Sequence, residues 1–209
     1  MRTYLYKVMH DAGTAPCVDD GILTLAICKP AIRRTAQPGD WIYGFAAQSR
    51  LGKRLIYVAR VDEALPAGEY YRQARYWKRS DSIYRWRAGR LVQISNDVHG
   101  KDNCIKDIGT PPNYAGARVL VCREFRYFGS ADSAQFTSPF PDLMRYVSKV
   151  GQGHRVNLPG RVHGELDSLS SAIWAAHPRT KILGKPSDAR PKGRGRCKPS
   201  RLLQTRKAC

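Results

Sequence analysis

The chain has 209 residues, of which 42% are hydrophobic, and a formal net charge of +19 at pH 7. That length allows one domain with a substantial core plus an extension. The positive charge favours a polyanionic partner, with nucleic acid as the first candidate. No apolar run approaches the roughly 18 residues of a membrane-spanning helix, and the first residues lack the apolar core of a signal peptide. We therefore expect a cytoplasmic protein with no membrane partner.

The charge is distributed unevenly along the chain. Residues 178–209 contain eleven lysines and arginines and one acidic residue, Asp188, a net charge of +10. More than half of the excess charge thus lies in the last 32 residues. We predict one domain over residues 1–177, followed by a basic and disordered tail over residues 178–209 that adds non-specific affinity for nucleic acid.

The first half of the chain alternates short apolar segments with turn residues. Residues 3–9 and 22–28 are predicted to be strands, separated by a loop rich in Asp, Gly and Pro. Pro30 can begin a short helix, which a Gln-Pro-Gly-Asp turn follows. Two further strands, at 41–47 and 54–61, form the clearest hairpin in the sequence.

The second half contains more helical pattern. A helix is predicted over 66–77, then a hairpin within 82–95, then a long polar loop over 96–116 and a long strand over 117–128. Two more helices are predicted at 141–150 and 165–176. This mixture of mostly antiparallel strands with short helices between them predicts an α+β fold.

Several polar residues are candidates for binding or catalysis. Lys29 and Arg33 lie where a strand gives way to a helix, so they can contact phosphate, although a solvated helix face explains them equally well. Asp11 follows the end of a strand and is a candidate general base or part of a plain turn. The long loop carries Asn96, His99 and Asp107, a plausible acid–base and hydrogen-bonding set or simply solvated side chains.

The six cysteines show no CxxC pair and no Cys/His spacing typical of zinc, so no metal and no cofactor is predicted. Cys28 lies in an apolar run and is predicted to be a core residue. Nucleophile motifs such as GxSxG, HExxH and the P-loop are absent, which lowers the expectation of the common hydrolases and NTP enzymes.

Five segments together resemble one known family, the nucleotide-modification-associated domain of the second type. The segments are TLAICKPAIRRTAQPGDWIYG, RLIYVARV, SDSIYR, VLVCREFRYFG and GQGHR. The resemblance spans residues 4–155 and implies a small bacterial or phage protein linked to hypermodified DNA bases. The matching positions are Asp11, Gly13, Pro16, Lys29, Pro30, Arg33, Gly39, Asp40, Asp81, Tyr84, His99, Asp107, Tyr127, Phe128, Gly129, Gly153 and His154.

The order of strand, short helix, Gly-Asp turn and two strands is also similar to the PUA-like group, which includes the ASCH, EVE and YTH domains. Those domains are small β-barrels that hold a base in a pocket. The resemblance therefore implies an α+β, PUA-like and mostly antiparallel β-barrel with short flanking helices.

The resemblance and the charge lead us to predict a protein that binds nucleic acid, with DNA favoured, or a nucleotide. In this interpretation the protein recognises a modified base in a pocket and is associated with DNA base modification. Cationic residues contact phosphate, aromatic residues stack on a base, and Asp11 and His99 read its edge. The predicted binding residues are Lys29, Arg33, Tyr43, Tyr127, His154 and Arg155.

Two alternatives stay open. The first is an enzyme that catalyses a step of nucleotide or DNA base modification, with Asp11, Asp81 and His99 as catalytic candidates. The second is an RNA-associated accessory protein that acts mainly through its basic tail. A pocket in which Asp11, His99 and Lys29 converge within hydrogen-bonding distance would favour the enzyme.

Overall fold

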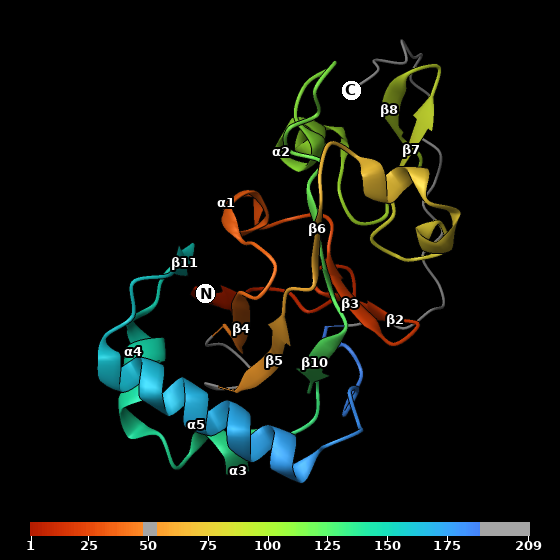
Figure 1. The fold of residues 1–209 in the computed structure, drawn as a ribbon. Coiled ribbons are helices and arrows are strands. Elements are labelled where there is room, and N and C mark those ends of the chain that lie inside the picture. Colours follow the sequence, from red (N-terminus) through yellow and green to blue (C-terminus); the bar gives the residue numbers. More distant parts are fainter. Residues whose placement is uncertain (48–53, 189–209) are drawn as a thin grey trace.

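The computed structural model describes residues 1–47 and 54–188 (Figure 1). The strands are β1 (Thr3–Val8), β2 (Cys17–Asp19), β3 (Ile22–Leu25), β4 (Trp41–Ala46), β5 (Leu55–Arg60), β6 (Glu63–Leu65), β7 (Tyr84–Arg87), β8 (Arg90–Gln93), β9 (Val119–Cys122), β10 (Glu124–Tyr127) and β11 (His154–Arg155). The α-helices are α1 (Pro30–Thr35), α2 (Cys104–Ile108), α3 (Ala134–Thr137), α4 (Pro141–Lys149) and α5 (Gly160–Ala176). Three 3-10 turns complete the set: η1 (Glu69–Arg72), η2 (Ala74–Tyr76) and η3 (Lys101–Asn103).

The central sheet has five strands in the order β10-β5-β4-β1-β11. Strands β1 and β4 run parallel, and the other neighbours run antiparallel. All six residues of β1 are buried, because alternate side chains enter different cores. Tyr4 and Tyr6 belong to one core, whereas Leu5 belongs to another. The central sheet is thus covered on both faces.

Two layers provide that cover. Helices α4 and α5 pack on one face, where Leu143, Val147 and Leu166 meet Leu5 and Phe45 of the sheet (Figure 1). The other face meets α1 and a four-stranded antiparallel sheet with the order β2-β3-β9-β6.

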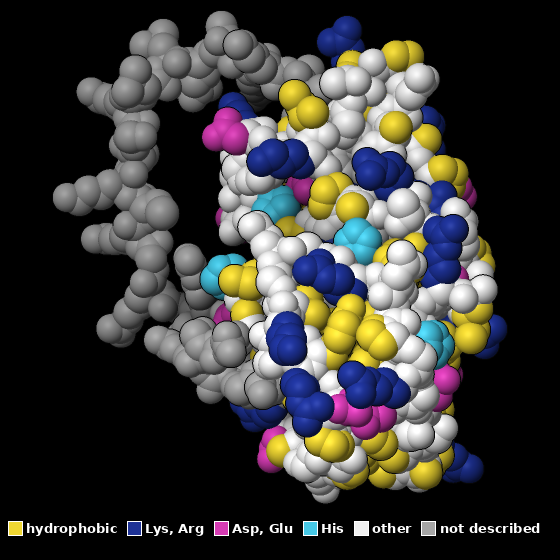
Figure 2. Space-filling view, turned by 90° about the vertical axis from the view of Figure 1, so that its left-hand side faces the viewer, with side chains coloured by type: hydrophobic (Ala, Val, Ile, Leu, Met, Phe, Trp, Pro, Cys, Tyr) yellow, Lys and Arg dark blue, Asp and Glu magenta, His cyan; other side chains and the backbone are white. Residues whose placement is uncertain are grey.

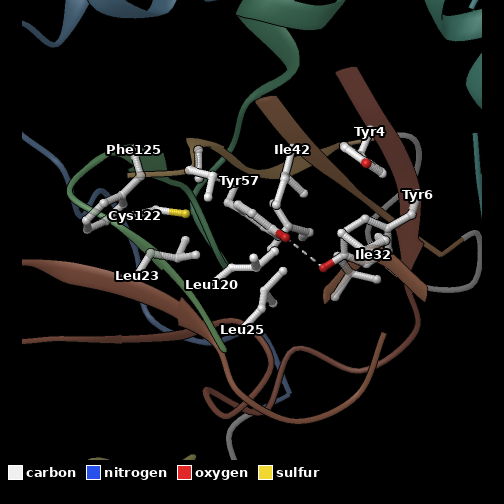
Figure 3. Packing of buried hydrophobic residues seen from close by; sticks show 14 of the residues in the cluster. Tyr4, Tyr6, Leu23, Leu25, Ile32, Ile42, Tyr57, Leu120, Cys122 and Phe125 are labelled. Atoms are coloured by element: carbon white, nitrogen blue, oxygen red, sulfur yellow. Dashed lines mark hydrogen bonds between the residues drawn. The ribbon is translucent and has the colours of Figure 1, made fainter. Parts of the chain in front are cut away.

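Figure 3 shows the core on this second face, where the hydroxyls of Tyr6 and Tyr57 hydrogen-bond to each other over 2.9 Å. This bond satisfies both phenols inside an otherwise apolar core.

A third core lies beyond the four-stranded sheet. Here η1, η2 and the β7–β8 hairpin (residues 69–93) form what we call the aromatic unit. Its buried tyrosines pack ring against ring: Tyr70 stacks on Tyr76 with ring centres 4.4 Å apart, and Tyr71 meets Tyr84 edge to face. Helix α2 adds Ile108 to the same core. The unit lies at the opposite end of the molecule from α4 and α5 (Figure 1).

The chain after α5 returns to the central sheet. Tyr127 donates its backbone N–H to the carbonyl of Lys181, and Leu183 donates to the carbonyl of Tyr127. Within residues 178–188, which we predicted to open the basic tail, residues 181–183 therefore pair with Tyr127 of β10, and Ser187 and Asp188 bond Asp11. Residues 189–209, the rest of the predicted tail, lie outside the described residues.

The structure confirms an α+β fold with short helices. The described strands do not close into a barrel, so the PUA-like part of the prediction is not confirmed. Both predicted hairpins are present, as β4–β5 and β7–β8. The helix predicted over 66–77 is wrong: Gly68 takes a φ of 75°, and two 3-10 turns replace the helix. The predicted loop over 96–116 contains η3 and α2.

Candidate active site

A strained turn between β3 and α1 presents the thiol of Cys28. Cys28 and Lys29 both adopt the left-handed conformation, with φ of 58° and 44°. Such angles cost non-glycine residues about 1–3 kcal/mol and concentrate at functional sites. Pro30 then begins α1. The turn leaves the Cys28 side chain half-buried, whereas the free cysteines Cys17 and Cys122 are buried.

Two residues from another part of the chain complete a linear arrangement at this thiol. The Sγ atom of Cys28 lies 3.1 Å from Nε2 of His99. The other ring nitrogen of His99, Nδ1, lies 2.6 Å from Oδ2 of Asp107, which α2 carries. A thiol, an imidazole within hydrogen-bonding distance and a carboxylate on the far ring nitrogen are the parts of an activated cysteine nucleophile. We call these three residues the triad.

The Asp107 carboxylate is held by further donors. The phenol of Tyr84 donates to Oδ2 over 2.9 Å, and the backbone N–H of Cys28 donates to Oδ1 over 3.4 Å. With Oδ2 accepting from Nδ1–H, the Nε2 atom of His99 faces the sulfur. The side chain of Gln93 fixes the same loop by donating to the carbonyl of His99. The carboxylate and the thiol are thus joined both through His99 and through the backbone.

The surroundings of His99 favour its protonated form. The hydrogen bond that Nδ1–H donates to Asp107, and then the contact with Cys28, raise the pKa of His99 to about 10, although burial opposes this. His99 is therefore an imidazolium at neutral pH. Its Nε2–H faces the sulfur of Cys28 at hydrogen-bonding distance.

The buried side chain of Arg33 links the two segments that carry Cys28 and Asp107. Its side chain is 1% exposed, and its guanidinium donates only to backbone carbonyls. Nε bonds the carbonyl of Cys28 at 2.7 Å, and Nη2 bonds the carbonyl of Asp107 at 3.0 Å. Nη1 reaches the carbonyls of Gly116 and Arg118. We predicted a phosphate contact for Arg33, which would require the side chain to leave this buried position.

Lys29 and His154 lie together beside the triad. The ammonium of Lys29 donates to the carbonyl of Lys7 and lies 4.6 Å from the centre of the Tyr6 ring. Burial lowers the pKa of Lys29. Burial also lowers the pKa of His154, with the charges of Arg155 and Lys29 contributing. Figure 2 shows basic and histidine side chains on the face that carries α1 and β11.

A hollow of about 250 Å³ lies between α1 and the segment that follows α2, and no triad residue lines it. It is lined by Pro30 and Arg34 from α1, by Lys106 next to Asp107, and by Arg118. The Nε atom of Arg118 is buried and has no hydrogen-bond partner within the described ranges 1–47 and 54–188. Among the described residues, three basic ones and no acidic one line this hollow, so its charge suits an anion.

The other candidates lie in separate networks. Asp11 accepts from the phenol of Tyr127 at 2.7 Å and from the N–H and hydroxyl of Ser187. Asp81 is fully buried beneath Tyr70 and Thr24. Burial raises the pKa of both carboxyls. Across the described part of the chain, no hydrogen bond joins Asp11, His99 and Lys29 to one another.

The two aromatic candidates are core residues. Tyr43 is 2% exposed, and its hydroxyl bonds Ser170 of α5 at 2.6 Å. Tyr127 is 1% exposed and holds Asp11. Stacking of either ring on a base would need the core to open. Cys28, which we predicted to be a core residue, is instead the member of the triad that sequence reasoning missed. The sequence offered one signal for this role: Cys28 lies between an apolar strand and the Lys-Pro pair that begins a helix.

The fold and the triad define an α+β protein with the geometry of a cysteine nucleophile. The chain belongs to a known family, because the family model described as nucleotide modification associated domain 2 matches residues 1–192. The predicted family is thereby confirmed. No curated protein and no solved structure matches the chain. Within residues 1–47 and 54–188, no helix is long and apolar enough to cross a membrane, and no group of His, Cys, Asp and Glu is arranged to hold a metal ion.

Proposed function

We propose that the protein is an enzyme of nucleotide or nucleic-acid base modification that uses Cys28 as a covalent nucleophile. The observation that carries this proposal is the continuous contact from Cys28 through His99 to Asp107. The family implies the nucleotide context, and the triad supplies the chemistry.

The reaction class is acyl transfer. The Cys28 thiolate attacks a carbonyl carbon, and a sulfur–carbon bond forms as the bond to the leaving group breaks. His99 gives its proton to the departing nitrogen or oxygen. Water or an amine then attacks the thioester and passes a proton back to His99. The acyl group leaves on that acceptor, and the thiolate and imidazolium are restored. Asp107 orients the ring throughout.

The cations around the triad support a substrate that carries phosphate. Lys29 follows Cys28 directly in the chain, and Pro30, the next residue, lines the hollow with Arg34, Lys106 and Arg118. A phosphate in that hollow would be attracted by the charges of these three basic side chains. Recognition of a modified base in a pocket, with Lys29, His154 and Arg155 near the phosphate, is compatible with the same site and is part of this proposal.

The test measures the reactivity of one thiol. The protein is treated with a limiting amount of iodoacetamide between pH 5 and 9, and the modified cysteines are located by mass spectrometry. We expect Cys28 to react first, because its half-buried sulfur lies within hydrogen-bonding distance of His99. Asp107→Asn and His99→Gln should each slow the reaction by about tenfold or more, because each breaks the contact that runs from Asp107 through His99 to the sulfur.

Cys17 and Cys122 serve as internal controls, because both are buried thiols without such an arrangement. A Cys28 that reacts no faster than a simple thiol, with a rate unchanged in His99→Gln, would refute the proposed nucleophile. Nucleosides and nucleotides from cells that express the protein or Cys28→Ser are then compared by mass spectrometry. The expected result is a modification that only the unaltered protein changes.

A further inference from the structure

A second hollow lies on the aromatic unit and takes no part in the triad. Its volume is about 450 Å³, and it is lined by two tryptophans, one tyrosine and three arginines: Trp77, Trp86, Tyr71, Arg72, Arg85 and Arg87. No acidic side chain lines it. The aromatic unit and its lead-in, residues 66–93, carry seven lysines and arginines and two acidic residues, one of which, Asp81, is buried.

The tryptophan rings are held in place by their own polar atoms. The indole N–H of Trp77 donates to the carbonyl of Tyr71 at 3.1 Å, and that of Trp86 donates to the carbonyl of Gly68 at 2.9 Å. With both N–H groups satisfied, the rings offer only their faces and edges to a ligand. Trp77 is nevertheless 48% exposed. A fixed and exposed indole is a stacking platform that costs little entropy to use.

The arginines divide into fixed and available groups. Arg85 donates to the carbonyls of Ser82 and Tyr84, and its guanidinium lies 5.4 Å from the centre of the Trp77 ring. It therefore supports Trp77. Arg72 lies 3.9 Å from the centre of the Trp86 ring and is exposed, and so is Arg87 at the end of β7. Arg72 and Arg87 can turn their N–H groups towards an anion without breaking a hydrogen bond to the described part of the protein.

We infer that this hollow, which we call the tryptophan pocket, binds single-stranded nucleic acid. A base stacks on Trp77, while Arg72 and Arg87 contact the flanking phosphates. Stacking on aromatic rings and a cationic groove along the backbone are the two elements of single-strand recognition. A duplex keeps its bases stacked on one another and cannot offer a face to Trp77. The net charge of +19 on the whole chain adds long-range attraction for the same ligand.

One residue links the tryptophan pocket to the segment before Cys28. Tyr71 forms one wall, and its hydroxyl donates to the carbonyl of Ala26, two residues before Cys28. The binding inference does not depend on the chemistry proposed for Cys28, because it rests on other residues.

The test uses the full chain and a fluorescein-labelled 15-nucleotide oligothymidine, with binding followed by anisotropy at several salt concentrations. Trp77→Ala should weaken binding at least about fivefold, and Trp77→Phe should keep most of it, because a ring remains. Arg72→Gln with Arg87→Gln should weaken binding and reduce the salt slope by about 0.7 for each lost contact. A duplex of the same length should bind more weakly and should not respond to Trp77→Ala.

The matched control is Lys149→Gln with Arg179→Gln, which removes two exposed charges outside the aromatic unit. Equal losses of affinity in the two double variants would mean that only net charge matters, and would refute binding at the tryptophan pocket. An unchanged affinity in Trp77→Ala would overturn it as well. If Trp77→Ala does not fold, Arg87→Gln, which changes an exposed residue, and the comparison with the duplex still test whether the tryptophan pocket binds a single strand. Binding that persists in Cys28→Ser separates this result from that of the proposed reaction.

Discussion

Two buried aspartates, Asp81 and Asp107, both contact the aromatic unit but have different charged partners. Each accepts a hydrogen bond from a tyrosine of the unit: Tyr70 for Asp81 and Tyr84 for Asp107. The cationic partner of Asp81 is Arg79, which is 4% exposed. The partner of Asp107 is His99, whose far nitrogen faces a half-buried thiol.

The difference shows what separates a structural carboxylate from a candidate catalytic one. Arg79 donates its remaining N–H groups to the carbonyls of Asp19 and Cys17, so the contacts of Asp81 end inside the protein. The contacts of Asp107 end on the half-buried thiol of Cys28. Asp81 was a catalytic candidate from the sequence, and its burial and raised pKa are typical of a functional carboxyl. The groups that its partner Arg79 contacts nevertheless leave Asp81 without a path to a substrate.

The largest expected effect tests the structural role of Asp81. Asp81→Ala removes the charge that faces the buried Arg79 and leaves the donors of Thr24 and Tyr70 unpaired. The free energy of unfolding should fall by about 3–5 kcal/mol, as for other broken buried ion pairs. Urea unfolding measures this loss. A loss below about 1 kcal/mol would mean that Asp81 does not stabilise the β2–β3 region, and our comparison would fail.

The second expected effect is a pH dependence of stability that originates in the triad. The folded protein raises the pKa of His99 from its ordinary 6.5 to about 10, so the native state binds this proton more tightly than the unfolded chain does. The resulting stabilisation is complete below about pH 6.5 and is lost as the pH rises towards 10.

Urea unfolding of the unaltered protein and of His99→Gln at pH 6, 8 and 10 measures this effect. The stability difference between the two proteins should shrink steadily with rising pH, while groups common to both cancel. A difference that stays constant from pH 6 to 10 would show that His99 does not hold its proton as the geometry indicates.

The smallest expected effect compares the two tyrosines directly. Tyr70→Phe and Tyr84→Phe each remove one donor to a carboxylate, and each should cost about 0.5–1.5 kcal/mol of stability. Only Tyr84→Phe should raise the pKa of His99 further, because Asp107 then directs more of its charge at the imidazole. NMR titration of the His99 ring distinguishes the two variants. An equal response in both would mean that the two networks are coupled.

Much of the fold could be predicted from local sequence pattern. The two hairpins follow from apolar runs on either side of turn residues, and the structure has both. Residues 66–77 have a helical pattern, but Gly68 adopts a left-handed conformation that interrupts a helix, and the tyrosines after it lie on two short 3-10 turns. The pairing of β1 with β4, parallel and 38 residues apart at Thr3 and Trp41, has no local signature.

The candidate site was predictable in part. His99 and Asp107 were expected to form an acid–base and hydrogen-bonding set, and their side chains are in contact. Cys28 was missed because its left-handed turn cannot be recognised in a run of apolar residues. Arg33 was expected at the surface because arginines are usually exposed. The backbone carbonyls that bury it come from Gly116 and Arg118, far along the chain, and only the fold brings them together.

Cys28 and His99 are 71 positions apart in the chain. The reactivity of the Cys28 sulfur therefore depends on whether the segments that carry the two residues have folded against each other. The contact between the thiol and the imidazole forms only when the segment after β8 and helix α2 have docked against the β3–α1 turn. Partial unfolding of either element would return Cys28 to the behaviour of a free thiol. Its alkylation rate can therefore follow the assembly of the native state without any label or any knowledge of the substrate.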